Sequence, residues 1–95
     1  MTNAEIAAVF DDIAEMLKLK KENIFKIRAY QKVARAIEEL PVAVAQLVAE
    51  DRVKEIPGAG EAITRKITEL VTTGKLDYYE RLKAEFPERT HPTPV

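Results

Sequence analysis

Two glycines one residue apart carry the strongest chemical signal in the sequence. They lie in the turn Pro57-Gly58-Ala59-Gly60. Glycine lets a backbone adopt positive φ and come close to another molecule. Gly60 also opens a segment with helical periodicity, and the first amides of a helix have no internal partner and lie at the positive end of its dipole. The turn therefore predicts an anion site made of main-chain N–H groups, which suits a DNA phosphate next to any base.

The residues around this turn make the prediction more specific, because a lone Gly-x-Gly occurs in many helical hairpins. Val53 and Ile56 precede the turn, and Ile63 and Ile67 follow it. These spacings place apolar side chains where two short helices can pack against each other. The segment resembles the helix-hairpin-helix motif of DNA repair and replication proteins, with a purely structural turn as the alternative.

A lysine near the hairpin is the candidate nucleophile. Lys66 lies about 60° from Ile63 on a helical wheel, at the edge of the expected buried face. Partial desolvation lowers the pKa of a lysine and frees its amine to attack an aldehyde, and a nearby cation such as Lys26 acts in the same direction. A surface lysine whose stem passes over the apolar face is the alternative.

Basic residues are concentrated in one part of a chain whose net charge is −1. Residues 18–35 hold seven of the fifteen lysines and arginines and only one acidic residue. Three of these cations fall together on one side of the expected helix: Arg28, Lys32 and Arg35. We expect a positive face on which Arg28 and Lys32 contact phosphates. The alternatives are a basic helix with no partner and local pairing of Arg35 with Glu38 or Glu39.

Apolar periodicity and punctuation predict only helices. Thr2 and Glu5 form a capping-box pattern, Asn23 is suited to cap a helix, Pro41 interrupts one, and Gly74 is suited to end one. The predicted helices cover residues 4–19, 24–39, 42–50, 60–73 and 76–86. No segment alternates with period two, so we expect an all-α bundle of four to five helices that contains one helix-hairpin-helix motif.

Composition limits the other classes of site. The chain has no cysteine, and its single histidine, His91, lies in a proline-rich segment, so we expect no metal site formed by side chains. No apolar run approaches the roughly 20 residues that span a bilayer, and no signal peptide is evident, so a cytoplasmic location is expected. We expect one domain over residues 1–86 and a disordered tail or linker start over residues 87–95.

Four features follow one another along the chain: AYQKVA at residues 29–34, Pro41, the glycine turn, and TGKL at residues 73–76. This order resembles the small N-terminal domain of family X DNA polymerases, and residues 76–87 are most similar to the bacterial members. The resemblance covers residues 4–87. It implies a compact helical unit that binds gapped DNA at the 5′-phosphate side. In several members this unit also removes a 5′-deoxyribose phosphate through a lysine Schiff base.

The resemblance assigns roles to the hairpin. Gly58 and Gly60 match positions whose amides face a phosphate. The carbonyls of Lys54, Ile56 and Ala59 match those that hold a Na⁺ or K⁺ ion bridging to DNA, and no other cofactor is implied. Lys54 also matches a basic residue near that phosphate.

The resemblance also assigns roles outside the hairpin. Lys66 falls on the Schiff-base position, Lys26 and Tyr30 match residues that line the 5′-phosphate pocket, and Lys32 matches a basic position. We expect Tyr30 to be half-buried with its hydroxyl at the rim of the core. Three positions depart from the family pattern. Phe25 stands in place of a histidine beside the pocket, Ala62 in place of a phosphate-binding lysine, and Tyr78 in place of another basic residue.

Three functions remain open from the sequence. The first is DNA binding without sequence preference, at gaps or 5′-phosphate ends in DNA repair, with a repair polymerase or ligase as the protein partner. The second is a deoxyribose-phosphate or abasic-site lyase that uses Lys66. The third is a helical protein-interaction module. The sequence lacks the paired aspartates that hold catalytic Mg²⁺ in the family, so we expect no polymerase activity from this chain alone.

Overall fold

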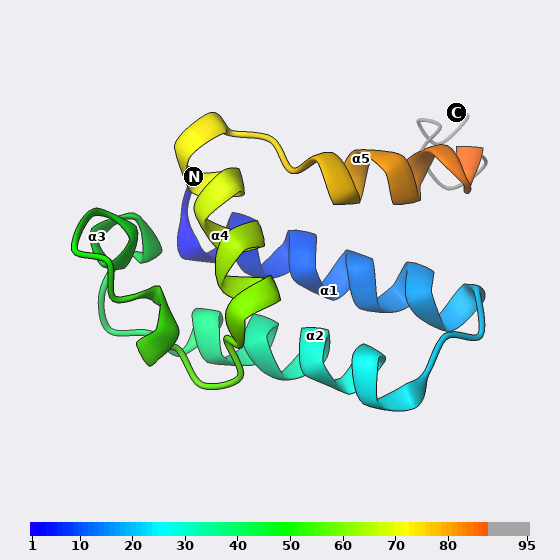
Figure 1. Cartoon of the computed structure of the whole chain (residues 1–95), viewed down its shortest axis with the longest axis horizontal. Coiled ribbons are helices and arrows are strands. Elements are labelled where there is room, and N and C mark those ends of the chain that lie inside the picture. The colour runs from blue at the N-terminus through cyan, green and yellow to red at the C-terminus, as the bar shows by residue number, and fades with distance from the viewer. Residues whose placement is uncertain (88–95) are drawn as a thin grey trace.

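The computed structural model describes residues 1–87, and these form a helical bundle with no strand. Two long antiparallel helices lie side by side, α4 crosses them, and α5 returns along α1 (Figure 1). The elements in chain order are α1 (Asn3–Leu19), α2 (Ile24–Glu38), α3 (Val44–Ala49), the single 3₁₀ turn η1 (Val53–Glu55), α4 (Glu61–Thr73) and α5 (Asp77–Ala84). The predicted all-α class and the helix-hairpin-helix arrangement are confirmed.

Three helix ends lie where the capping residues predicted them. The Glu5 N–H donates to the Thr2 hydroxyl (3.1 Å), and the Thr2 N–H donates to the Glu5 carboxylate (2.8 Å). The Asn23 side chain accepts the Phe25 N–H at 2.7 Å. Gly74 ends α4 in the left-handed region at φ 77°, which glycine adopts without steric cost.

A long-range contact makes α3 shorter than the predicted helix over residues 42–50. The Asn3 side chain donates to the Val42 carbonyl (2.8 Å) and accepts the Val44 N–H (2.9 Å). These two bonds hold the chain extended before Val44, so α3 begins there. They also join the start of α1 to the start of α3.

One continuous core joins the helices and positions the hairpin. Its largest fully buried side chains are Phe10, Ile6, Ile13, Met16, Leu17, Ile37, Ile56, Ile67, Leu76, Val33 and Val44. No polar or charged residue is buried within residues 1–87. Burial of Ile56 and Ile67 on either side of the glycine turn ties the hairpin to this core.

The last helix ends at Ala84, short of the predicted residue 86. The tail or linker expected over residues 87–95 lies, apart from Pro87, outside the described residues. Among the helices that the structure describes, none is long and apolar enough to cross a membrane.

Candidate nucleic-acid interface

The hairpin consists of η1, the glycine turn and the first turn of α4. Ile56 is 1% exposed, Ala59 9% and Ile63 7%, so the apolar side chains of the hairpin face the core. Gly58 and Gly60 are exposed. Gly58 has φ 88°, a conformation that favours glycine, whereas Gly60 has φ −72°, which any residue adopts. The backbone conformation therefore favours glycine at residue 58 but not at residue 60.

Hydrogen bonds inside the turn decide which amides can meet a ligand. The Ala59 N–H donates to the Ile56 carbonyl (3.0 Å), and the Gly60 N–H donates to the Gly58 carbonyl (3.1 Å). The expectation that the Gly60 amide faces outward is therefore wrong, because the turn is tight enough to use that donor itself.

From Gly58 to Ala62, three exposed residues keep main-chain N–H groups without an acceptor in the described part of the chain: Gly58, Glu61 and Ala62. Glu61 and Ala62 begin α4, where the helix dipole adds positive potential. The sequence pointed to the first amides of this helix but assigned phosphate contacts only to Gly58 and Gly60, not to these two residues. Ala62 was considered only as a lost lysine, and the general lack of partners at helix starts was the signal available.

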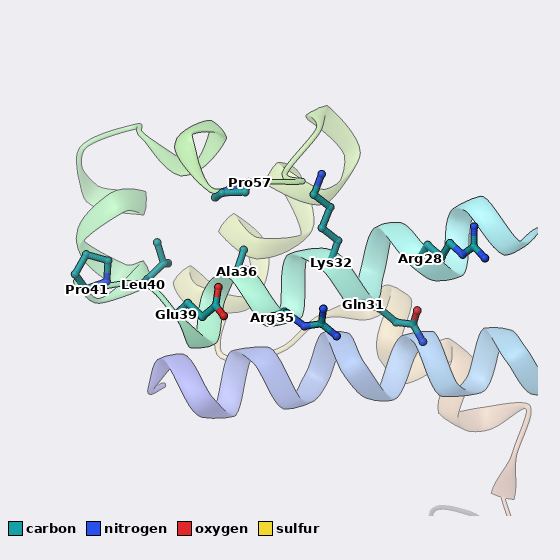
Figure 2. Close-up of a pocket in the computed structure, with 9 residues that line it drawn as sticks. All are labelled: Arg28, Gln31, Lys32, Arg35, Ala36, Glu39, Leu40, Pro41 and Pro57. Carbon is teal, nitrogen blue, oxygen red and sulfur yellow. The ribbon is translucent and has the colours of Figure 1, made fainter.

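Lys32 of α2 lies against the turn. A Cβ atom built on Gly58 would lie 3.4 Å from Lys32 Cγ and 3.6 Å from the Val33 nitrogen. These are ordinary van der Waals distances, so α2 packs directly against the turn, and the positive φ of Gly58 is the feature that favours glycine there. Figure 2 shows the Lys32 side chain extending from α2 toward the Pro57 end of the hairpin. The structure therefore brings the expected Lys32 cation to the hairpin.

A groove of about 510 Å³ runs between α2 and the hairpin. Its lining consists of Arg28, Gln31, Lys32, Arg35, Ala36, Glu39, Leu40, Pro41 and Pro57 (Figure 2). Arg28, Lys32 and Arg35 are exposed and share one face of α2, as the sequence predicted. No ion pair forms between Arg35 and either Glu38 or Glu39, so this charge is not neutralised locally.

A second cavity, of about 370 Å³, surrounds Lys66 on the other side of α2. Lys66 Nζ lies 4.7 Å from the centre of the Tyr78 ring, and Lys26 Nζ lies 6.0 Å from the same centre. Burial lowers the pKa of Lys66, the Lys26 cation lowers that pKa further, and Glu69 opposes both. The lowered Lys66 pKa and the action of Lys26 match the sequence-based expectation.

Tyr30 is more deeply placed than expected. It is only 4% exposed and stacks between Phe10 and Tyr78, with ring centres 6.1 Å and 6.3 Å away. Burial raises the pKa of its hydroxyl. The expectation of a half-buried Tyr30 is wrong because the ring of Tyr78, which lies far along the chain, covers it. Tyr30 still lines the Lys66 cavity.

Tyr78 is the residue whose role the sequence did not reveal. The sequence showed only that Tyr78 replaces a basic residue of the family. In the structure its ring lies beneath the Lys66 ammonium and against Tyr30. An aromatic face attracts a cation at this distance. Tyr78, which departs from the basic residue of the family pattern, therefore forms a wall of the cavity.

The carbonyls assigned to a monovalent cation have lone pairs available. The Ile56 carbonyl accepts the Ala59 N–H, and the Ala59 carbonyl accepts the Thr64 hydroxyl at 3.3 Å. Within residues 1–87, the Lys54 carbonyl accepts no backbone hydrogen bond from outside its own 3₁₀ turn. Each carbonyl oxygen has two lone pairs, so the set is compatible with Na⁺ or K⁺. In the same part of the chain, no cluster of His, Cys, Asp or Glu could hold a metal ion.

Comparisons with known proteins agree with this geometry. A helix-hairpin-helix domain family matches residues 1–76. Two curated relatives each align with 88 residues, or 93% of the chain. This chain is 30% identical to "DNA polymerase/3'-5' exonuclease PolX" of Bacillus subtilis and 30% identical to "DNA polymerase lambda" of Arabidopsis thaliana. The chain spans only 15% and 16% of those relatives' lengths. The chain belongs to the helix-hairpin-helix domain family, in the form that family X DNA polymerases carry.

Proposed function

We propose that this domain binds DNA without sequence preference, at gaps and 5′-phosphate ends, by placing a backbone phosphate on the hairpin amides. Membership of the family and the polymerase relatives support DNA binding in general. The observation that carries the finer proposal is the group of exposed, unpartnered N–H groups of Gly58, Glu61 and Ala62. Contacts to main-chain amides bind phosphate oxygens and ignore base identity.

Side-chain cations add to this clamp. Lys32 lies against the turn, and exposed Lys54 lies in η1 beside it. Because the net charge of the chain is −1, it offers DNA little overall attraction, so affinity depends on a few local contacts. For two to four neutralised phosphates, the log–log dependence of affinity on salt has a slope of about −2 to −4.

A monovalent cation belongs to the same proposal. The carbonyls of Lys54, Ile56 and Ala59 would hold Na⁺ or K⁺ at the hairpin. When bound, such an ion supplies positive charge opposite a phosphate. Affinity measured in K⁺ or Na⁺ should then exceed affinity measured at equal ionic strength in a bulky organic cation. Equal affinities would argue against the ion.

The direct test is a binding titration on three duplexes of one sequence: intact, gapped with a 5′-phosphate, and gapped with a 5′-hydroxyl. The proposal predicts tightest binding to the phosphorylated gap and the same ranking for a second, unrelated sequence. Failure to shift any of these DNAs at about 50 mM salt, where electrostatic binding is strong, would overturn the proposal.

A second activity is supported by one specific observation, the lowered pKa of Lys66 in a cavity next to Lys26. This site suits a lyase. The neutral amine adds to the C1′ aldehyde of an abasic sugar, water leaves, and a protonated Schiff base forms. Loss of a C2′ proton then expels the phosphate at C3′, and water finally releases the amine.

Borohydride trapping on DNA with an abasic 5′ end tests this lyase activity, because it reduces the Schiff base to a stable adduct. Wild-type protein should be trapped, and Lys66→Ala should not. Lys75→Ala, which removes an exposed lysine after the end of α4, is the matched control and should trap normally. Equal trapping of Lys66→Ala and wild type would remove the assignment.

A further inference from the structure

The arginines of α2 differ from the other arginines of residues 1–87. Arg52, Arg65 and Arg81 each pair with a carboxylate at 2.7–2.9 Å. Arg28 and Arg35 are exposed and take part in none of the ion pairs of these residues. Their charge is therefore available to an anionic partner, and both border the groove between α2 and the hairpin.

The floor of this groove is apolar, which a clamp for phosphate alone does not need. Leu40, Pro41 and Pro57 contribute to it, and Glu39 is the single carboxylate in the lining. Figure 2 shows Glu39 beside Leu40 and Pro41, at the end away from Arg28. A cationic edge suits the backbone of a single strand, and an apolar floor without aromatic rings can pack against an accessible base or sugar, as in an unpaired strand, without stacking on it.

The length of the cationic edge fits a short stretch of strand. Arg28 and Arg35 are separated by about 10 Å along the helix axis, at about 1.5 Å per residue. If the unpaired strand kept the B-form advance of about 3.4 Å per nucleotide, the edge would span about three nucleotides, and a more extended strand would span fewer. Lys32, between them, also touches the hairpin turn, so the groove continues directly into the phosphate clamp.

The groove and the Lys66 cavity lie on different sides of α2. Lys26, Ala29 and Tyr30 face the cavity, whereas Arg28, Lys32 and Arg35 face the groove, and the two hollows share no lining residue. Two separate segments of nucleic acid can therefore occupy them at once. At a gap these are the strand with the 5′ end and the unpaired strand opposite.

We propose that the α2 groove binds the unpaired strand opposite the gap, while the strand with the 5′-phosphate is held by the hairpin and by the Lys66 cavity, which Ala62 of the hairpin also lines. This inference rests on the proposed function and adds a second strand to its footprint. Arg28 and Arg35 contact phosphates of the unpaired strand, and the floor at Pro57 receives a base or sugar.

Fluorescence anisotropy with two DNAs tests the groove. Both carry the same 5′-phosphorylated duplex end, but only one has an unpaired strand extending past that end. The test variant is Arg28→Ala/Arg35→Ala. The control is Lys18→Ala/Lys75→Ala, which removes the same charge from exposed positions outside the groove and the cavity.

Wild type should prefer the DNA with the unpaired strand, and the arginine variant should lose that preference. Two lost contacts to a single strand lower the salt slope by about 1.4 and the affinity by about tenfold or more near 0.1 M salt. Binding to the plain duplex end should be the same for wild type and both variants.

Equal losses on both DNAs, or no loss on either, would overturn the groove assignment. An arginine variant that binds both DNAs normally but fails to bind a polyglutamate peptide that wild type binds would identify a peptide site instead. If wild type favours the unpaired strand through these arginines but binds a 5′-hydroxyl form of the same DNA equally well, only the gap-end function fails. Absence of all DNA binding overturns both.

Discussion

The three glycines of the chain allow the hairpin mechanism to be separated from fold stability. Gly58 has positive φ and lies against Lys32, Gly74 has positive φ with nothing within 4 Å of an added Cβ, and Gly60 has neither constraint. If a DNA phosphate binds next to Gly60, it occupies the open space that a Cβ at this residue would fill. We therefore predict that Gly60→Ala weakens DNA binding without destabilising the fold.

The magnitudes follow from the backbone. Alanine at positive φ costs about 1–2 kcal/mol, offset by about 0.4–1 kcal/mol from the lower entropy of the unfolded chain. Gly58→Ala and Gly74→Ala should each lose about 1 kcal/mol, which lowers Tm by about 4–8 °C in a domain of this size. Gly60→Ala should stay within about 0.5 kcal/mol of wild type, because the entropy gain offsets the poorer helix cap.

DNA affinity should rank the same variants differently. A methyl group at residue 60 keeps a phosphate from the amides of Glu61 and Ala62, and losing a hydrogen bond to a charged group costs about 1.5–3 kcal/mol, or about tenfold or more in affinity. Gly74→Ala, at the other end of α4, should bind DNA normally when folded.

Thermal unfolding by circular dichroism and anisotropy on gapped DNA, measured on the same samples, provide the test. The reasoning is refuted if Gly60→Ala binds DNA as wild type does. It is also refuted if the loss of affinity in all three variants simply follows the loss of Tm.

Three further predictions concern the cavity, the core and the first helix cap. Lys26→Ala should raise the pKa of Lys66 toward 10.5 without reaching it, because burial is the larger cause; an NMR titration of the Lys66 Cε signal would show this, and an unchanged pKa would contradict it. Ile67→Ala should cost about 2–5 kcal/mol in urea unfolding, since Ile67 is fully buried beneath the hairpin; a smaller loss would mean that α4 packs loosely. The Thr2 hydrogen bonds lower the pKa of Glu5 below 4.5, so its contribution to stability is present above that pH and is lost as pH falls through the folded value. Glu5→Gln keeps an acceptor but not the titration, so unfolding midpoints at about pH 7 and about pH 3 should differ less in the variant than in wild type.

Local chemistry made much of the fold predictable. The capping box at Thr2, the Asn23 cap and the Gly74 stop involve residues within four positions of one another, and each lies as expected. The hairpin and the edge position of Lys66 were predictable for the same reason, because helical periodicity places neighbours three and four residues apart on one face.

Contacts between distant segments decided the rest. Asn3 sets the start of α3 from about forty residues away. Tyr78 buries Tyr30 and lies beneath Lys66, and the Gly60 amide is used inside the turn once the chain closes it. Such contacts depend on how the helices cross, which side-chain packing over the whole core determines and periodicity along the chain does not. The α2 groove likewise exists only in the folded chain, because it is lined by α2, by the segment after it and by Pro57 of the hairpin.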